Sequence, residues 1–208
     1  MNFIKRNLDR IVLGIILLFL FVCIIFYLFN TLKKEQSVPE AEKIDEIVEY
    51  NYYLHEDDTD LYRAYFGQLK DILSTDSIDY DKYANVLTSL FVIDFFNLDN
   101  KTTNMDIGGV QYLHSSIKDN FILKASDTIY KNVKSNIYGD RNQELPIVSD
   151  VVIKSIDNLS FEYNNIKDDK AYDIVVTIKY EKDLGYPEEI NLTIIREKDK
   201  LVIVEVNN

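Results

Sequence analysis

An uncharged run of nineteen residues, IVLGIILLFLFVCIIFYLF, occupies residues 11–29 of the 208-residue chain. As a helix rising about 1.5 Å per residue, it would extend roughly 28 Å, close to the thickness of a bilayer's hydrocarbon core. The run has no polar face, which a helix packed on a soluble core would show. It exceeds the apolar region of a cleaved signal peptide, and no small-x-small cleavage site follows it. We therefore predict an uncleaved transmembrane helix over residues 11–30, preceded by a short tail over residues 1–10.

The orientation of this helix rests on the basic residues at its two ends. Lys5, Arg6 and Arg10 precede the run, and Lys33 and Lys34 follow it. Basic residues favour the cytoplasmic side of a membrane, and the bias here is about one charge plus the terminal amine. We predict a single-pass protein of the cell membrane, with the N-terminus in the cytoplasm and the C-terminal domain outside.

The charge of the chain is unevenly distributed. The whole chain carries −12, but residues 1–34 hold five basic residues and one acid, so residues 35–208 have 18 basic and 34 acidic residues, a net −16. Such a domain repels phosphate backbones, and we expect no nucleic-acid partner. The only cysteine, Cys23, lies in the apolar run, so no disulfide can form within the domain. The expected partners are the bilayer, other envelope proteins or a second copy of the chain.

Residues 31–43 are polar with one Pro, which predicts a stalk, and residues 44–208 form the predicted extracytoplasmic domain. Apolar and polar residues alternate over residues 44–54, which favours a strand, although a helix continuing from the stalk stays open. Residues 110–114 are consistent with another short strand.

Three later stretches have apolar residues at helical spacing. They are residues 61–73, residues 79–98, and a segment that starts after Ser115 or Ser116 and includes Val133. The second stretch is apolar on nearly all sides in its C-terminal half, so we place it at the centre of the domain.

From Pro146 onward the period changes to two, as in strands. We predict strands at residues 147–157, 170–182, 188–197 and 200–206, joined in a meander by tight turns. Helices followed by such a meander predict the α+β class, with the helices packed on one face of a curved four-stranded antiparallel sheet.

Few residues suggest chemistry. The histidines His55 and His114 do not share a zinc-binding spacing. His55 begins the sequence HEDDTD, which resembles a cation site but lacks the Gly and Glu of an EF-hand loop. A helix N-terminus explains this run better. We predict no catalytic, cofactor-binding or metal-binding residue, and no enzyme.

Asp94 stands out because it lies in the apolar stretch LFVIDFFNL. A buried carboxylate must be paired, hydrogen-bonded or neutral. It could transfer protons in a pocket, but we favour a structural role, bonded to a backbone donor or a Lys near the turn that contains Asp106, Gly108 and Gly109. Together these four residues are the candidate pocket or turn positions.

The order of elements over residues 11–206 resembles the membrane-anchored, cystatin-like (nuclear-transport-factor-like) cone domains of Gram-positive and other bacteria. These include the assembly subunit of type IV secretion and conjugation machines. The stretches LFVIDFFNLDNKTTNMDIGGVQY and DLGYPEEINLTI also resemble anchored proteins of low-GC Gram-positive bacteria. The resemblance implies a cone fold.

Cone domains host several functions, so the fold alone selects none. We expect a scaffold or assembly subunit that binds protein partners in the cell envelope, such as those of a secretion or conjugation machine. The alternative is a sensor or small-ligand-binding domain, which needs an open cavity near Asp94.

Overall fold

The computed structural model describes residues 8–34, 41–164 and 166–207 of the chain. The chain divides into two compact units, Met1–Pro39 and Glu40–Asn208. The boundaries at residues 10 and 43 stay predictions, and residues 1–7 and 35–40 lie outside the described residues.

The first unit contains one helix, α2 (Leu8–Lys34), of 27 residues. Fifteen large apolar side chains between Val12 and Leu28 are exposed along it. Among the described residues, no helix combines the length and the mean hydropathy needed to cross a membrane. The membrane anchor over residues 11–30 therefore stays a prediction.

The second unit is an α+β domain built on a four-stranded antiparallel sheet, as predicted. Its strands are β3 (Val148–Tyr163), β4 (Ile166–Tyr180), β5 (Glu189–Glu197) and β6 (Lys200–Asn207), in that order across the sheet. Ile174, Val176 and Ile178 of β4 are buried on the face that carries the helices, because successive side chains of a strand point to opposite faces.

The hairpin between β3 and β4 is longer than predicted. Its strands continue to Tyr163 and Ile166, and Asn164 takes a left-handed conformation at the turn (φ 48°). The added part of β3 packs against a second apolar cluster, which is separate from the main core. This cluster contains the buried residues Ala171, Ile195, Val202 and Val204 and the partly buried Leu159, Phe161 and Tyr163.

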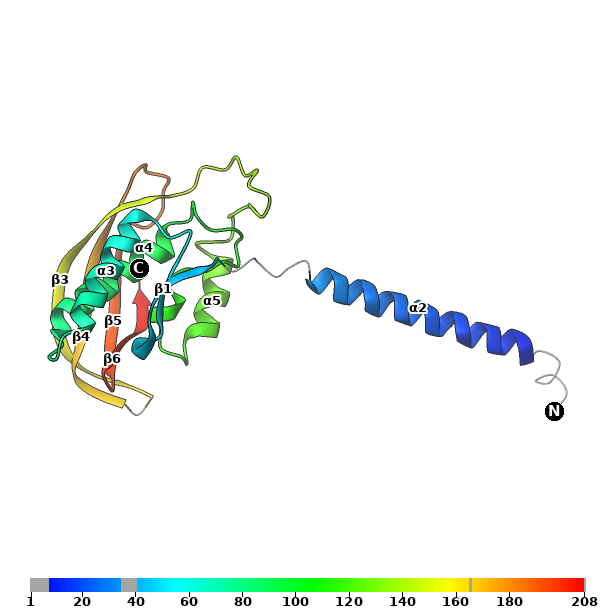
Figure 1. The fold of residues 1–208 in the computed structure, drawn as a ribbon, viewed down its shortest axis with the longest axis horizontal. Helices are drawn as coiled ribbons and strands as arrows, with labels where there is room; N and C mark the ends of the chain where they lie inside the picture. Colours follow the sequence, from blue (N-terminus) through cyan, green and yellow to red (C-terminus); the bar gives the residue numbers. More distant parts are fainter. Residues whose placement is uncertain (1–7, 35–40, 165, 208) are drawn as a thin grey trace. The chain divides into compact units, whose positions relative to one another are not determined.

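Two long helices, α3 (Asp60–Leu73) and α4 (Tyr80–Phe96), lie side by side over the sheet (Figure 1). Thr59 caps α3 by accepting a hydrogen bond from the Tyr62 N–H, and Asp79 caps α4 by accepting one from the Lys82 N–H. Twelve side chains of α4 are buried, because the helix packs against α3 and the sheet. Its central position confirms the prediction from its apolar sequence.

The third predicted helix is shorter than expected. Helix α5 covers only Lys118–Asp127 and ends at Thr128, whose backbone is not helical (φ −121°, ψ −93°). Tyr130 follows in a turn, where its hydroxyl bonds to the backbone of two distant residues, Gly108 and Phe95. If α5 continued to Val133, as predicted, Tyr130 would leave this turn and its hydroxyl would lose the hydrogen bonds to Gly108 and Phe95.

The segment over residues 44–54 is a hairpin. Strands β1 (Lys43–Ile47) and β2 (Tyr52–His55) pair antiparallel, with the 3-10 turn η1 (Val48–Tyr50) between them. The strand interpretation is thus confirmed in part. Residues 110–114 are not a strand as predicted. They form the 3-10 turn η2 (Val110–Tyr112), followed by one parallel bridge from Leu113 to Ile203 of β6.

Candidate functional site

Asp94 lies in the last turns of α4, where both of its carboxylate oxygens have a partner. Oδ1 is 2.6 Å from Lys101 Nζ, and Oδ2 accepts a hydrogen bond of 2.7 Å from the Gly109 N–H. The Lys101 side chain is 7% exposed and that of Asp94 16%. These contacts are the backbone donor and the lysine that a structural role required, and each carboxylate oxygen has one of them as its partner.

The charge of Asp94 stabilises the ammonium form of Lys101. Burial alone would lower the pKa of Lys101, but the carboxylate of Asp94, helped by Asp106, outweighs burial and raises the pKa well above its ordinary value. Lys101 therefore keeps its ammonium charge beside the Asp94 carboxylate, and the 2.6 Å contact acts as a fixed internal link.

The turn that follows holds the other candidate positions. Asp106 Oδ2 accepts a 2.8 Å hydrogen bond from the Thr102 N–H. A Cβ at Gly108 would lie 2.1 Å from the carbonyl oxygen of Asp94, so only glycine fits there. Gly109 has φ +75°, and a Cβ there would meet the ring of Phe91 at 2.6 Å. The structure thus brings Asp94, at the end of α4, against Gly108 and Gly109 of the turn that follows, and Asp106 lies in the same turn.

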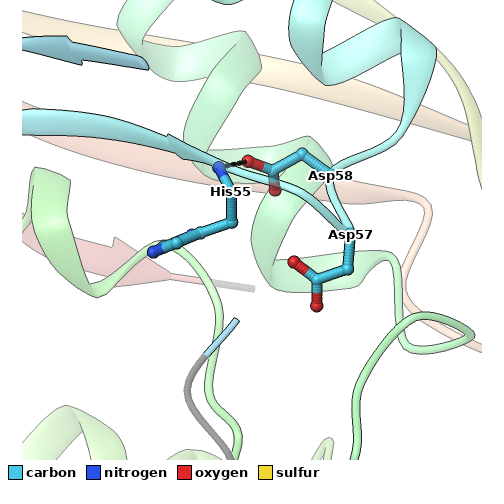
Figure 2. A group of neighbouring side chains, drawn as sticks. All are labelled: His55, Asp57 and Asp58. Atoms are coloured by element: carbon cyan, nitrogen blue, oxygen red, sulfur yellow. Dashed lines mark hydrogen bonds between the residues drawn. The ribbon is translucent and has the colours of Figure 1, made fainter. Parts of the chain in front are cut away.

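The loop before α3 brings together His55, Asp57 and Asp58, with one possible ligand atom from each within 4.8 Å of the others (Figure 2). Carboxylates and imidazole suit several divalent metals. In this view, however, the His55 ring extends away from the two carboxylates. Asp58 Oδ2 already accepts a 2.6 Å hydrogen bond from the His55 backbone N–H.

Arg63 of α3 also closes this loop. Its guanidinium donates hydrogen bonds to the carbonyl oxygens of Glu56 (2.6 Å) and Asp58 (3.0 Å). With the Thr59 cap, these contacts make the loop a helix N-terminus, as the sequence predicted. Burial, reinforced by the nearby charge of Asp94, raises the pKa of Asp58 to about 7, against an opposing hydrogen bond from His55.

A partly open cavity of about 340 Å³ lies where α5, the last turn of α4 and the end of β6 meet. Its apolar lining comes from Phe95, Phe121, Ala125, Ile129 and Val206. Asp94 does not line this cavity, although its sequence neighbour Phe95 does.

Three polar residues, Lys124, Thr128 and Asn207, complete the lining of the cavity. None of the eight lining residues is predicted from the sequence as part of a cavity. The cavity depends on the distance between α5 and β6, which local periodicity does not encode.

No protein-family model, curated protein or solved structure matches this chain. Function must therefore be argued from the chain's own residues.

Proposed function

We propose that the protein is a single-pass membrane scaffold, which holds its acidic domain outside the cell membrane and binds protein partners there. The observation that carries the proposal is the surface of α2. Fifteen large apolar side chains are exposed along this helix, within a segment that has no charge for nineteen residues. An apolar surface of this extent is unfavourable in water and favourable in lipid.

Two loops of the domain support a role in protein binding. Met105 is 56% exposed and Tyr138 is 90% exposed. Their loops are joined by a 2.8 Å hydrogen bond from the Asn136 N–H to the Thr102 carbonyl oxygen, and Ile137 is also exposed. Tyr and Met are enriched at protein interfaces. We name Met105, Ile137 and Tyr138 the loop patch, and we propose that an envelope protein or a second copy of the chain docks there.

The test is photo-crosslinking in membranes of cells that express the full chain. A photoreactive phenylalanine analogue replaces Tyr138, and a second protein carries it at Asp76, an exposed residue outside the patch. We expect defined adducts from position 138, and fewer adducts when Met105→Ser is added. Equal adduct patterns from both positions, or no adduct from position 138, would contradict docking at the loop patch.

The alternative function, a small-ligand or sensor domain, is favoured by one observation. The cavity beside Phe95 lies between the helices and the sheet, where the cone interpretation would place a ligand. Its volume is at the lower end of the range for small-molecule sites.

A further inference from the structure

We propose that the cavity between α5 and β6 binds a small carboxylate that has one negative charge and a compact apolar body. This inference goes beyond the scaffold function and does not depend on it. It rests on the shape and lining of the cavity and on the charge at its mouth.

The interior of the cavity favours a ring or a short chain. The rings of Phe95 and Phe121 have their centroids 5.0 Å apart, and Phe95 is only 4% exposed. A cavity of 340 Å³ corresponds to about eleven water volumes, which suits a ligand the size of a substituted benzoate. Aromatic walls favour an aromatic ring in offset or edge-to-face contact.

The mouth of the cavity favours a negative charge. Lys124 is exposed there and forms no ion pair with the described residues, although the domain has far more acids than bases. Residues 115–138 contain four Lys and two Asp, so this segment is net +2 within a strongly acidic domain. A carboxylate at the mouth would pair with Lys124, whereas an ammonium group would be repelled.

The other two polar lining residues, Thr128 and Asn207, indicate where in the cavity the carboxylate of the ligand would lie. The Thr128 hydroxyl donates a 2.7 Å hydrogen bond to the Lys124 carbonyl oxygen, so it is already used within the helix end. Asn207, on β6, also lines the cavity, and its side chain has no hydrogen bond to another described residue, so it can donate to a carboxylate. The carboxylate would therefore lie at the mouth, with the apolar body packed against the contacting rings of Phe95 and Phe121.

The experiment uses the full chain in lipid nanodiscs and follows ¹⁹F NMR signals of two probes with the same ring. 4-(Trifluoromethyl)benzoate carries a negative charge, and 4-(trifluoromethyl)benzylammonium carries a positive one. Empty nanodiscs measure partition into the lipid. We expect saturable broadening of the benzoate signal above this background and none for the ammonium. Saturable binding of both probes with equal affinity, or of neither, would overturn the proposal.

Two matched variants test the role of Lys124. Lys124→Glu reverses the charge at the mouth, and Lys131→Glu makes the same change at an exposed residue that does not line the cavity. We expect Lys124→Glu to weaken benzoate binding about tenfold or more, and Lys131→Glu to change it less than about threefold. Both side chains are exposed, so both proteins should keep the wild-type circular dichroism spectrum. Equal effects of the two variants would overturn the pairing with Lys124.

A third variant tests the cavity itself. Thr128→Phe places a large ring at an exposed lining position and should abolish benzoate binding by filling the mouth. Unchanged benzoate binding in this variant would place the ligand elsewhere and overturn the proposal.

Discussion

Asp94 and Lys101 form an ion pair that is almost withdrawn from solvent, with 2.6 Å between Asp94 Oδ1 and Lys101 Nζ. The pair joins the end of α4 to the turn that follows it, and Gly109 completes the site by donating its N–H to Asp94 Oδ2. Neither charged residue reaches the cavity or the loop patch. Their role is to fix the end of the central helix, and their removal should affect stability first.

Replacing only one residue of the Asp94–Lys101 ion pair should lower the free energy of unfolding. Lys101→Met leaves the Asp94 carboxylate buried without its counter-charge, and we expect a loss of about 3–5 kcal/mol in the free energy of unfolding. The double variant Asp94→Asn/Lys101→Met removes both charges and should cost less than the sum of the single variants. Urea unfolding of the domain, followed by circular dichroism, measures these values. Additive costs would show that the two groups do not interact.

Asp58 should make the stability of the domain depend on pH. Its pKa is raised by burial to about 7 in the folded protein, from 3.8. Between pH 3.8 and about 7, the folded state binds more protons at Asp58 than the unfolded state does. The contribution of Asp58 to the free energy of unfolding is therefore complete below about pH 4 and is lost as the pH rises through 7. The slope for one group is at most about 1.4 kcal/mol per pH unit.

The measurement compares wild type with Asp58→Asn, whose side-chain oxygen can still accept from His55. We expect the free energy of unfolding of wild type to fall relative to the variant between pH 5 and pH 8. A constant difference across this range would contradict the raised pKa.

Two glycines should respond in opposite ways to the same substitution. Gly108→Ala places a Cβ against the Asp94 backbone, and we expect a loss of about 3 kcal/mol or more in stability. Gly67 lies inside α3 with no atom within 4 Å of the added Cβ, so Gly67→Ala should gain about 0.5–1 kcal/mol from helix propensity. Thermal unfolding of the three proteins tests this. Similar melting temperatures for both variants would refute the tight packing at Gly108.

Charges inside α2 should weaken membrane insertion. Leu18→Arg together with Leu20→Arg adds two cations at the centre of the uncharged run, at a combined cost of roughly 6 kcal/mol on the insertion scale. We expect more of the variant in the supernatant after alkaline carbonate extraction. Leu18→Ala/Leu20→Ala is the matched control and should stay in the membrane pellet. If the arginine variant stayed there equally well, hydrophobic insertion would not hold the chain.

The regular parts of the domain were predictable because their periods are clear. The alternation around Ile174 and the uniform apolarity near Phe91 place β4 and α4 correctly, since each pattern records which faces are buried. Leu159, Phe161 and Tyr163 also alternate, so the longer β3 could have been found. The polar residues Asp157 and Asn158 interrupt the apolar alternation, so the predicted strand ends at residue 157.

The errors elsewhere arise from long-range contacts. The apolar spacing continues past Asp127 to Val133, but the chain leaves the helix to let Tyr130 bond to Gly108 and Phe95. Tertiary hydrogen bonds overrode the local preference for a helix. The partners of Asp94 were predictable by type, because a buried carboxylate needs a donor, whereas the cavity beside Phe95 was not.

The position of the domain relative to the membrane is the central claim, and cysteine labelling tests it most directly. Cys23 is the only native cysteine, so Cys23→Ser with Asp76→Cys leaves a single exposed thiol in the domain. Intact cells that express this protein are treated with a membrane-impermeant maleimide, with Cys23→Ser alone as the control. We predict labelling of the thiol in intact cells, to the same extent as after permeabilisation. Labelling that appears only after permeabilisation would place the domain in the cytoplasm and contradict the claim.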